Sequence, residues 1–588
     1  MLGSMIINQR QHVGLQKLSA IATVAHSTLG PRKKYKFIQD EATGESTLAS
    51  SCLRILDNLD LVTCAVSQLV YETIRAHHEV YRTGAGCLLF FAGAWSRAAL
   101  LCLQQGIPTS RVVAAMIEGM DLCVDVCKKR SVSFNALCVS TRKRITEASL
   151  DSKVIKGKRQ VKLSRHFCNT EPGTILVPEP RFSDVARLAA GLSHGCDDAM
   201  RLVIQASRIQ SKVIPNSVLD VTKVTTCVLP GFPEDHAHVC SGCVILLNPD
   251  QASVAHDLKN KPTSVVLISG DLSHSYRHLG FNRPAGIQCV GNRSNMSDLS
   301  KAEEWMGKVL EVLSHLEVDL VLVSGLVNAA VIQRCCQRHI LVVGKVRASV
   351  LKEMATATGA TLVTYVTQLS KHCIGKGIQV SIWREIGSHE GTPLTAINLD
   401  AGGSTRLVTA IITSPVHGKL QSLEDRFWAC AYRVHHALKD KAVLPGAGVT
   451  ELLCIHRLMK KVEAENPADG TRGSNPYLGI ILHLLADSFT EYLAAVMANS
   501  TGTSQVKARA VVNQKLQDVD SISADFSQLI LDSNEDIPPS KVFDNLSVKQ
   551  ESWRKALDLV LLVLQTDAEI ITGVDESKDG IHAGLMFL

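Results

Sequence analysis

Pro445-Gly446-Ala447-Gly448 stands directly before a long apolar segment, and Gly84-Ala85-Gly86 has the same place before another one in the first part of the chain. A third turn, Leu29-Gly30-Pro31, follows the first helical pattern. Glycines at the start of a helix let backbone N–H groups approach a phosphate, and the positive end of the helix dipole favours the bound anion. The turns therefore predict a seat for the phosphates of a nucleotide.

The turn at Gly84 has no group that could hold a metal ion. The stretch Tyr81-Arg82-Thr83-Gly84-Ala85-Gly86 contains no carboxylate, whereas Mg²⁺ beside a nucleotide is held by oxygen ligands, carboxylates foremost among them. The sequence thus predicts a phosphate seat that lacks its catalytic acid.

The composition is that of a globular protein. A chain of 588 residues is too long for one ordinary core, so we expect two or three domains. With 46% hydrophobic and 20% charged residues, a disordered chain is excluded. The most apolar stretch, Gly86 to Leu103, is interrupted by Ser96 and Arg97, which indicates a buried helix and no membrane span. The N-terminal residues contain no apolar run typical of a secretory signal, so we expect the 18 cysteines to be reduced thiols in the cytosol.

The net charge of +6 is concentrated in one segment. Between Arg142 and Arg165 the sequence has nine basic residues and only Glu147 and Asp151 as acids, so the rest of the chain is close to neutral. Such a run indicates a solvated insertion, with a nuclear-localisation signal or contact with an anionic partner as alternatives. No aromatic residue interrupts the run, so a surface for stacking nucleic-acid bases is not expected.

The two ends of the chain have helical patterns. We expect helices over 11–29, 53–80 with a break, 86–104, and from a cap at Thr109 or Ser110 to Lys128, with a hairpin at 36–49. Near the C-terminus, apolar residues at helical spacing predict a core helix, namely Trp553, Ala556, Leu557, Val560, Leu561 and Leu564. Three segments have the composition of insertions: 140–166, 466–476 and 500–540.

The centre of the chain has an α/β pattern. Asp319 to Ser324 contains a continuous apolar run of the buried parallel-strand type. A helix through Val331, a strand at 340–343, a helix at 348–358 closed by Gly359 and a strand at 361–365 follow. This order predicts a parallel sheet with right-handed crossovers, inserted into a domain built from both ends of the chain. Ser324-Gly325-Leu326-Val327 lacks the glycine fingerprint of dinucleotide binding.

Two local motifs suggest other chemistries. Gly191-Leu192-Ser193-His194-Gly195 matches a hydrolase nucleophile elbow, but a helical pattern precedes it where that motif requires a strand. The residues His236, His238, Cys240 and Cys243 would suit a zinc ion if alternation along a strand placed the first three on one face. No second pair with zinc-site spacing accompanies them, so we expect strand and turn residues here and no zinc.

The order and spacing of several short segments resemble group II chaperonins over most of the chain. These segments are Leu29-Gly30-Pro31, Lys36 to Asp40, Ala92-Gly93, Gly106-Ile107-Pro108, Val443 to Gly448 and Val542 to Lys549. Leu557 to Gly573 (LDLVLLVLQTDAEIITG) and Tyr81-Arg82-Thr83-Gly84 are similar, more narrowly, to the chaperonin-like Bardet–Biedl syndrome proteins.

The resemblance implies a multidomain α+β/α/β fold, that of a group II chaperonin-like subunit. A helical equatorial domain of the nucleotide-binding type would comprise 1–115 and 445–588, an intermediate domain 116–225 and 385–444, and an α/β apical domain 226–384. The resemblance also implies a set of nucleotide contacts: Gly30, Pro31, Thr83, Gly84, Gly86, Gly446, Ala447, Gly448 and Asp544.

The chain departs from the family pattern where ATP is hydrolysed. Thr83 stands where the family has the metal-binding aspartate of Gly-Asp-Gly-Thr-Thr, Ser50-Ser51-Cys52 replaces Asn-Asp-Gly, and Cys430 aligns with the hinge aspartate that activates water. Without these carboxylates neither Mg²⁺ nor the attacking water is held, so we expect no Mg-dependent hydrolysis.

Two roles stay open for the glycine turns. In one, ATP binds at the backbone N–H groups, and Arg82, Lys33 or Lys34 neutralises the phosphates without metal. In the other, the glycines serve only as turns and helix starts.

The resemblance implies a chaperonin-like assembly factor and not an enzyme. Its partners would be other chaperonin-like Bardet–Biedl proteins, subunits of the cytosolic group II chaperonin and client subunits of the Bardet–Biedl complex, in the cytoplasm, at the centrosome or basal body and in the cilium. Gly270 to Ser300, where the family's apical protrusion is expected, is polar and lacks the apolar face of a general client-binding helix. The alternative is an ATP-hydrolysing subunit of a chaperonin ring that folds cytosolic proteins. A third is an unrelated enzyme that uses Ser193 or the cluster from His236 to Cys243.

Overall fold

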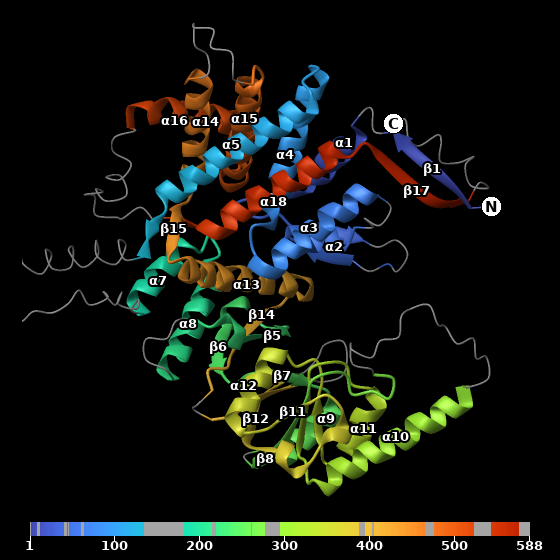
Figure 1. Ribbon diagram of the computed structural model, residues 1–588. Coiled ribbons are helices and arrows are strands. Elements are labelled where there is room, and N and C mark those ends of the chain that lie inside the picture. Colours follow the sequence, from blue (N-terminus) through green and yellow to red (C-terminus); the bar gives the residue numbers. More distant parts are fainter. Residues whose placement is uncertain are drawn as a thin grey trace, which may run out of the picture. The chain divides into compact units, whose positions relative to one another are not determined.

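The chain divides into two compact units, and the first of them is made from both ends of the sequence. In the computed structural model, Met1–Met200 and Asp425–Leu588 form the first unit and Arg201–Glu424 the second (Figure 1). The structure describes residues 2–8, 12–39, 44, 46–59, 64–134, 182–213, 219–259, 261–276, 295–386, 394–402, 405–464, 475–522 and 542–575. A discontinuous first unit accords with the expected insertion of the centre of the chain. The boundaries of the three expected domains stay a prediction.

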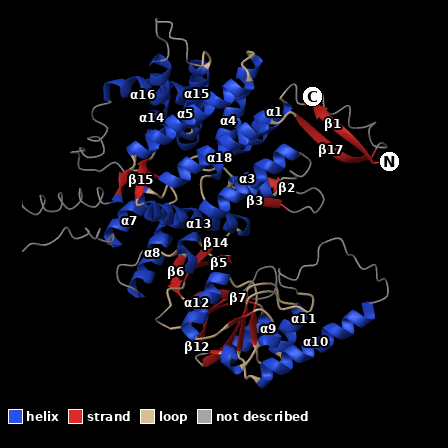
Figure 2. Ribbon diagram, viewed as in Figure 1, coloured by secondary structure: helices blue, strands red, loops and turns tan. Residues whose placement is uncertain are grey.

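Long helices dominate the first unit (Figure 2). They are α1 (Val13–Ala22), α3 (Ala65–Tyr81), α4 (Ala85–Gln104), α5 (Thr109–Arg130), α14 (Val449–Ala464), α15 (Leu478–Thr501), α16 (Gln505–Ile522) and α18 (Leu546–Gln565). Shorter elements are a 3₁₀ helix (Thr23–Thr28), α2 (Cys52–Asp57) and α7 (Phe182–Gly191). Two more helices, α8 (Asp197–Val213) and α13 (His417–Asp440), each contain a unit boundary in their sequence.

Short strands connect distant parts of this unit. The predicted hairpin is confirmed, with β2 (Lys36–Gln39) antiparallel to β3 (Ser46–Ala49). Two sheets that the sequence patterns did not predict pair residues far apart in the chain: β1 (Leu2–Asn8) with β17 (Ala568–Asp575), and β15 (Ala442–Pro445) with β16 (Phe543–Asn545) and β4 (Val132–Ser133).

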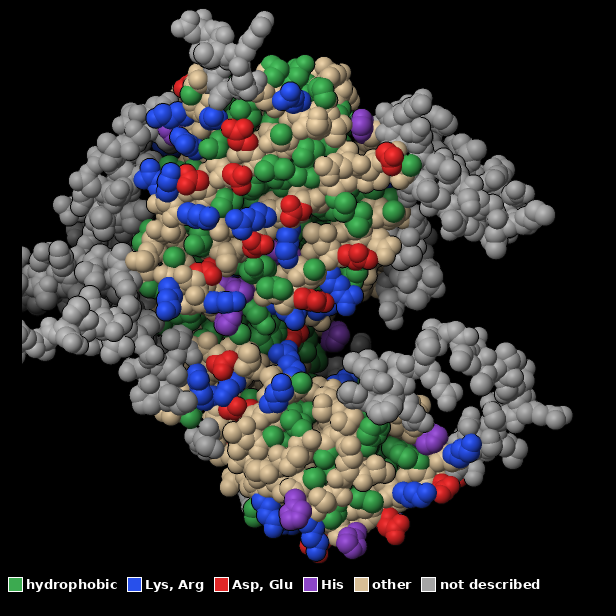
Figure 3. All heavy atoms as spheres, viewed as in Figure 1, with side chains coloured by type: hydrophobic (Ala, Val, Ile, Leu, Met, Phe, Trp, Pro, Cys, Tyr) green, Lys and Arg blue, Asp and Glu red, His purple; other side chains and the backbone are tan. Residues whose placement is uncertain are grey.

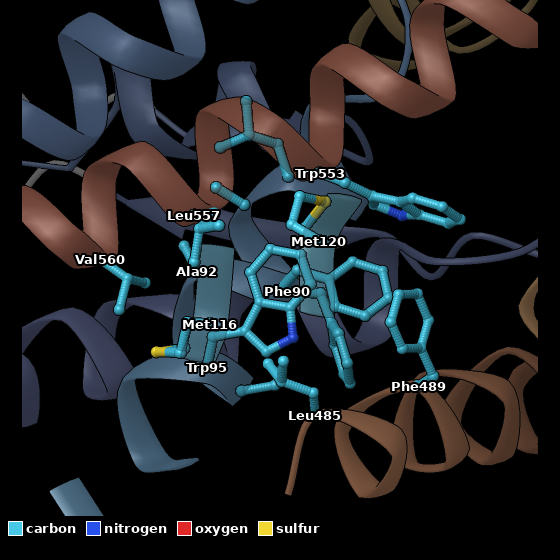
Figure 4. Packing of buried hydrophobic residues seen from close by; sticks show 14 of the residues in the cluster. Phe90, Ala92, Trp95, Met116, Met120, Leu485, Phe489, Trp553, Leu557 and Val560 are labelled. Atoms are coloured by element: carbon cyan, nitrogen blue, oxygen red, sulfur yellow. The ribbon is translucent and has the colours of Figure 1, made fainter. Parts of the chain in front are cut away.

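Aromatic rings fill the core of the first unit (Figure 4). The ring centroids of Phe91 and Phe489 are 4.9 Å apart, and those of Phe489 and Trp553 are 5.1 Å apart. Trp95, one turn after Phe91, lies 4.8 Å from it. Because these rings belong to α4, α15 and α18, they join both ends of the chain in one core, where aromatic pairs add to the stability that burial gives.

Two helices of this core are long and apolar enough to cross a membrane. They are α4 and α15, but most of their most apolar residues are buried among the other helices. Burial of Phe90, Phe91 and Leu485 against neighbouring helices accounts for their composition.

The helical patterns locate most elements correctly but two details are wrong. The segment 11–29 is α-helical only as far as Ala22 and continues as a 3₁₀ helix. No side chain caps α5, which follows Pro108, although Thr109 or Ser110 is expected to do so. The polar segment 500–540 is helical as far as Ile522, and Ala508 and Val512 of α16 are buried against the bundle, while its being an insertion stays a prediction. The basic run 142–165, the segment 140–166 and residues 466–474 lie outside the described residues.

The second unit contains a seven-stranded sheet covered by helices. Its strands are β7 (Cys243–Leu247), β8 (Pro262–Ile268), β9 (Leu320–Val323), β10 (Leu341–Val343), β11 (Leu362–Val363), β12 (Gly375–Ile386) and β13 (Leu394–Asp400). Across the sheet they lie in the order β10-β9-β8-β12-β13-β7, and β11 also pairs with β8. The helices are α9 (Pro249–Asp257), α10 (Asn295–His315), α11 (Ala329–Cys336) and α12 (Ala348–Thr358). A smaller sheet contains β5 (Val224–Pro230), β6 (His238–Ser241) and β14 (Val408–Ser414).

The parallel sheet that the sequence predicts is confirmed for β8, β9 and β10. The expectation is incomplete in two respects. Strand β11 pairs with Leu267 and Ile268 at the end of β8, because β12 occupies the same edge of β8 over 262–265. Strands β12, β13 and β7 are antiparallel, so the sheet is mixed.

Charges of both signs are interspersed on the face shown in Figure 3. Lys and Arg side chains alternate there with Asp and Glu side chains, and apolar atoms lie between them. This face therefore presents no broad field of one sign that would attract a polyanion.

We expect Trp553→Ala to destabilise the first unit by about 3–5 kcal/mol, because it removes a fully buried ring from the junction of three helices. Leu562→Ala is the matched control on the same helix: its side chain is 51% exposed, and we expect a change below about 0.5 kcal/mol. Urea unfolding followed by far-ultraviolet circular dichroism measures both. Equal losses in the two variants would contradict the placement of α18.

Candidate functional site

The glycine turns lie where the sequence places them, at the starts of α4 and α14. Gly84 precedes α4 with a φ of 86°, and Gly448 precedes α14 with a φ of 88°. Ala447, between the two glycines of its turn, also has a positive φ of 54°. These left-handed conformations favour glycine and turn the chain into each helix.

Close packing also requires glycine at these positions. A Cβ atom on Gly84 would lie 2.6 Å from Ser552 Oγ and 2.9 Å from His77 Nε2. A Cβ atom on Gly446 would lie 2.9 Å from the backbone of Val542. The turns are therefore explained by internal contacts of the protein, whether or not a phosphate binds.

The structure brings the turns at Gly30 and Gly84 together. A Cβ atom on Gly86 would lie 3.3 Å from Thr28 Oγ1, directly before the turn at Gly30 and Pro31. Pro31 in turn lies against Gly195 in the joint between α7 and α8. Thr83 accepts a hydrogen bond at its carbonyl oxygen from His77 Nε2, at 3.0 Å, with the proton assigned to that nitrogen.

The turn at 445–448 is connected to Asp544 through the short sheet. Leu444 of β15 pairs with Asp544 of β16, and α18 follows directly. Lys549 Nζ lies 2.6 Å from Asp544 Oδ2 and 2.6 Å from Glu451 Oε1 on α14. His194 Nε2 lies 3.2 Å from the other oxygen of Asp544. Both oxygens of this predicted nucleotide contact thus have partners within the protein.

The charged groups of Asp544 and Lys549 stabilise each other's ionised form. Burial opposes ionisation of Asp544, but the Lys549 ammonium and His194 outweigh it and hold the pKa of the carboxyl well below its usual range. Burial likewise opposes the charge on Lys549, but Asp544 and Glu451 outweigh it and raise the pKa of the ammonium. Asp544 and Lys549, two members of the triad that they form with Glu451, are therefore charged across the whole neutral range.

A carboxylate that sequence reasoning missed lies beside one of the substituted positions. Ser51 Oγ accepts from the N–H of Arg54 at the start of α2 and donates to Asp425 Oδ2, at 3.2 Å. Arg54 Nε also lies 3.5 Å from this oxygen. The signal in the sequence was an acidic residue five positions before Cys430 on α13. Its contact with Ser51 could not be predicted, because the two residues are 374 positions apart.

Cations surround this carboxylate. Burial, together with the nearby Arg433 and Arg426, lowers the pKa of Lys33, and Asp425 only partly compensates. Arg426 donates to the hydroxyl of Tyr35 at 2.9 Å. The excess of positive charge at Lys33, which follows the turn at Gly30, suits an anion better than a metal ion.

The alternative motifs are placed as structural elements. Ser193 is buried in the turn between α7 and α8, so the strand that a nucleophile elbow requires is absent, as expected. His236 lies in a 3₁₀ helix and only His238 and Cys240 in β6, so the condition for a zinc face, three ligands on one strand, is not met. In the part of the chain that the structure covers, no group of three or more His, Cys, Asp or Glu residues could hold a metal ion.

The second unit has a pocket of about 210 Å³ at the carboxyl ends of β8 and β11. Tyr276 and Tyr365 contact each other in its wall, with ring centroids 5.7 Å apart, and Trp305 of α10 lies opposite. In open α/β sheets, ligands bind outside the carboxyl ends of parallel strands. The segment Gly270 to Ser300, where the apical protrusion is expected, begins at this pocket, but its residues 277–294 lie outside the described part of the chain.

Comparisons with known proteins agree with the resemblance that the sequence indicates. The model of the TCP-1/cpn60 chaperonin family matches residues 192–573. The chain is 34% identical to the chaperonin-containing T-complex member BBS12 of Homo sapiens, with 97% of each chain covered, and 32% identical to the protein of that name from Xenopus laevis, with 96% of each covered. T-complex protein 1 subunit gamma of Bos taurus is 19% identical over 97% of this chain and 93% of its own. These matches confirm the similarity to group II chaperonins. They also confirm a similarity, among the Bardet–Biedl syndrome proteins, to protein 12.

We expect Lys549→Met to destabilise the first unit by about 3–5 kcal/mol, because it leaves Asp544 and Glu451 buried without their cation. Arg554→Met, on the same helix, breaks the exposed pair with Glu551 and is the matched control, with a loss below about 1 kcal/mol. Urea unfolding of both variants tests this. Similar losses of unfolding free energy in Lys549→Met and Arg554→Met would show that the triad is exposed to solvent.

Acid should remove the contribution of Asp544. A carboxyl whose pKa is lower in the folded than in the unfolded state stabilises the fold above its unfolded pKa, and this contribution is lost as the pH falls toward the folded value. We expect the difference in unfolding free energy between the wild type and Asp544→Asn to be constant from about pH 5 to 7 and to shrink below about pH 4. Urea unfolding at a series of pH values measures it, and a difference that does not change with pH would contradict the ion network.

Proposed function

Because the chain belongs to the TCP-1/cpn60 chaperonin family, we propose that it is a chaperonin-like assembly factor that works by binding and does not hydrolyse ATP. Its first unit would comprise the equatorial domain and part of the intermediate domain, and its second unit the apical domain and the rest of the intermediate domain, with the boundaries given by the resemblance. The clients would be subunits of the Bardet–Biedl complex that serves cilia. Other chaperonin-like Bardet–Biedl proteins and the cytosolic chaperonin would take part, in the cytoplasm and at the basal body.

The observation that carries the proposal is the chemistry at the three positions where the family has acids. Thr83 supplies only a neutral hydroxyl and a backbone carbonyl that bonds with His77. Ser51 caps α2, and Cys430 is a buried thiol. Phosphoryl transfer requires a metal held against the phosphates and an acceptor that orients water, and none of these side chains offers a fixed negative charge.

Nucleotide binding without hydrolysis is compatible with the same geometry. The starts of α4 and α14 present backbone N–H groups, and Lys33 with its neighbouring arginines provides positive charge beside the turn at Gly30. ATP would then act as a ligand that stabilises one form of the subunit. Zinc and Mg-dependent chemistry form no part of the proposal.

One observation favours the alternative of an ATP-hydrolysing ring subunit. Asp425 brings a carboxylate to Ser51, where the family has an aspartate. The carboxylate of Asp425 already forms an ion pair with Arg54 and accepts a hydrogen bond from Ser51, which counts against a role as a metal ligand or as an acceptor for water.

ATP turnover by the purified chain separates the two candidates. We expect no turnover above background and no difference between the wild type and Asp425→Asn, with Asp121→Asn, an exposed position on α5, as the matched control. Release of phosphate at a fixed Mg²⁺ concentration is the measurement. Turnover that Asp425→Asn abolishes and Asp121→Asn preserves would establish the ring ATPase instead.

Assembly can be measured in ciliated cells that lack the chain. We expect the subunits of the Bardet–Biedl complex to sediment as smaller species, and both the wild type and Asp425→Asn to restore the full complex. Normal sedimentation without the chain would refute the assembly role.

A further inference from the structure

Two thiols meet in the first unit where the joint between α7 and α8 contacts α13. Cys196 is the residue before α8, and its carbonyl oxygen accepts from the N–H of Met200 at 2.9 Å. The Cys430 thiol lies 3.8 Å from the same oxygen, so the two cysteines are direct neighbours. Cys430 is completely buried, whereas Cys196 is partly exposed.

The surroundings favour a thiolate at Cys196. A residue at the start of a helix lies at the positive end of its dipole. Arg433 Nη1 lies 3.9 Å from Cys430 Sγ and also donates to the carbonyl oxygens of Leu192 and Ser193, so this guanidinium is fixed beside the pair. The hydrogen bond with Cys430, and then Arg433, Lys33 and Arg426, outweigh burial and lower the pKa of Cys196 to about 5.

We propose that Cys196 and Cys430 form a redox-sensitive dithiol that a hydroperoxide converts into a disulfide. Cys196 is the thiol that reacts first, because it is the more exposed of the two, and Cys430 is the resolving thiol. This arrangement, an accessible thiolate next to a second cysteine, is the one that redox-sensing proteins use.

The chemistry balances with a hydroperoxide as the only oxidant. The Cys196 thiolate attacks the terminal oxygen of the hydroperoxide, an S–O bond forms as the O–O bond breaks, and the peroxide leaves as an alcohol or, from hydrogen peroxide, as water after taking up a proton. The Cys430 sulfur then attacks the sulfenic sulfur. An S–S bond forms, the S–O bond breaks, and the oxygen leaves as water with the proton of the Cys430 thiol.

A second group of thiols in the same unit serves as an internal control. Cys454 Sγ lies 3.9 Å from the carbonyl oxygen of Cys123, in the helical core. Burial and the neighbouring thiols raise the pKa of Cys454 and Cys127 far above the ordinary value. Both groups thus contain cysteines that lie close together. Of the two groups, the pair of Cys196 and Cys430 also has cations beside it and a thiol that is partly exposed to solvent.

Differential alkylation of the native full-length chain, read by mass spectrometry, tests the proposal. At pH 6 we expect iodoacetamide to label Cys196 roughly tenfold faster than an ordinary thiol, because the gain in thiolate outweighs its lower nucleophilicity. After a stoichiometric dose of hydrogen peroxide, the linked peptide Cys196–Cys430 should appear and dithiothreitol should remove it. In Cys430→Ser, dimedone should instead trap a sulfenic acid at Cys196.

Two variants keep the test decisive. Cys454→Ser should leave both the labelling rate and the linked peptide unchanged, and Cys196→Ser should abolish the linked peptide. If Cys430→Ser does not fold, the time course in the wild type replaces it, since dimedone should then lower the yield of the linked peptide. Labelling of Cys196 no faster than that of the other exposed thiols, or the absence of the linked peptide in the wild type, would overturn the proposal.

Discussion

The ammonium of Lys549, held between two buried carboxylates, is the constraint on which the arrangement of the first unit depends. The triad consists of Asp544 from β16, Lys549 from α18 and Glu451 from α14. His194 connects this triad to the joint between α7 and α8. A buried charge without its partner costs several kcal/mol, so none of these segments can shift without a large loss. Since α18 also supplies Ser552 against Gly84, the same network fixes the turn that precedes α4.

Glycine turns alone therefore do not identify a nucleotide site. Gly84 and Gly446 would be required by their contacts with Ser552 and Val542 even if no phosphate ever bound. A turn that binds a nucleotide is distinguished from a purely structural turn by the polar and charged side chains around it. In the proposed function, Thr83 and Ser51 stand where a metal would need fixed acids, and arginines lie close to Lys33 beside the turn at Gly30.

The sequence predicted the helices and the parallel strands because their signals are local. The apolar spacing of α18 and the run in β9 depend only on neighbouring residues. The pairing of β1 with β17, the mixed character of the sheet and the contact of Asp425 with Ser51 depend on residues far apart in the chain, and no spacing rule contains them. At the candidate site, the positions of the glycines were accessible from the sequence. The partners of Asp544 and the cations near Cys430 were not, because folding alone brings them together.

In the proposed function, Cys430 stands where the chaperonin family has an acid, and a thiol there changes the kind of charge that the site can carry. A carboxylate on α13 would be charged at every neutral pH and could orient water at all times. The thiol pair that is found there carries a charge only while Cys196 is reduced and ionised, beside the guanidinium of Arg433. Under the proposed function the position supplies no constant acceptor for hydrolysis, and under the proposed dithiol its charge responds to the redox state of its surroundings. A subunit that works by binding can use such a conditional charge, because binding requires a change in affinity and not a permanent catalytic group.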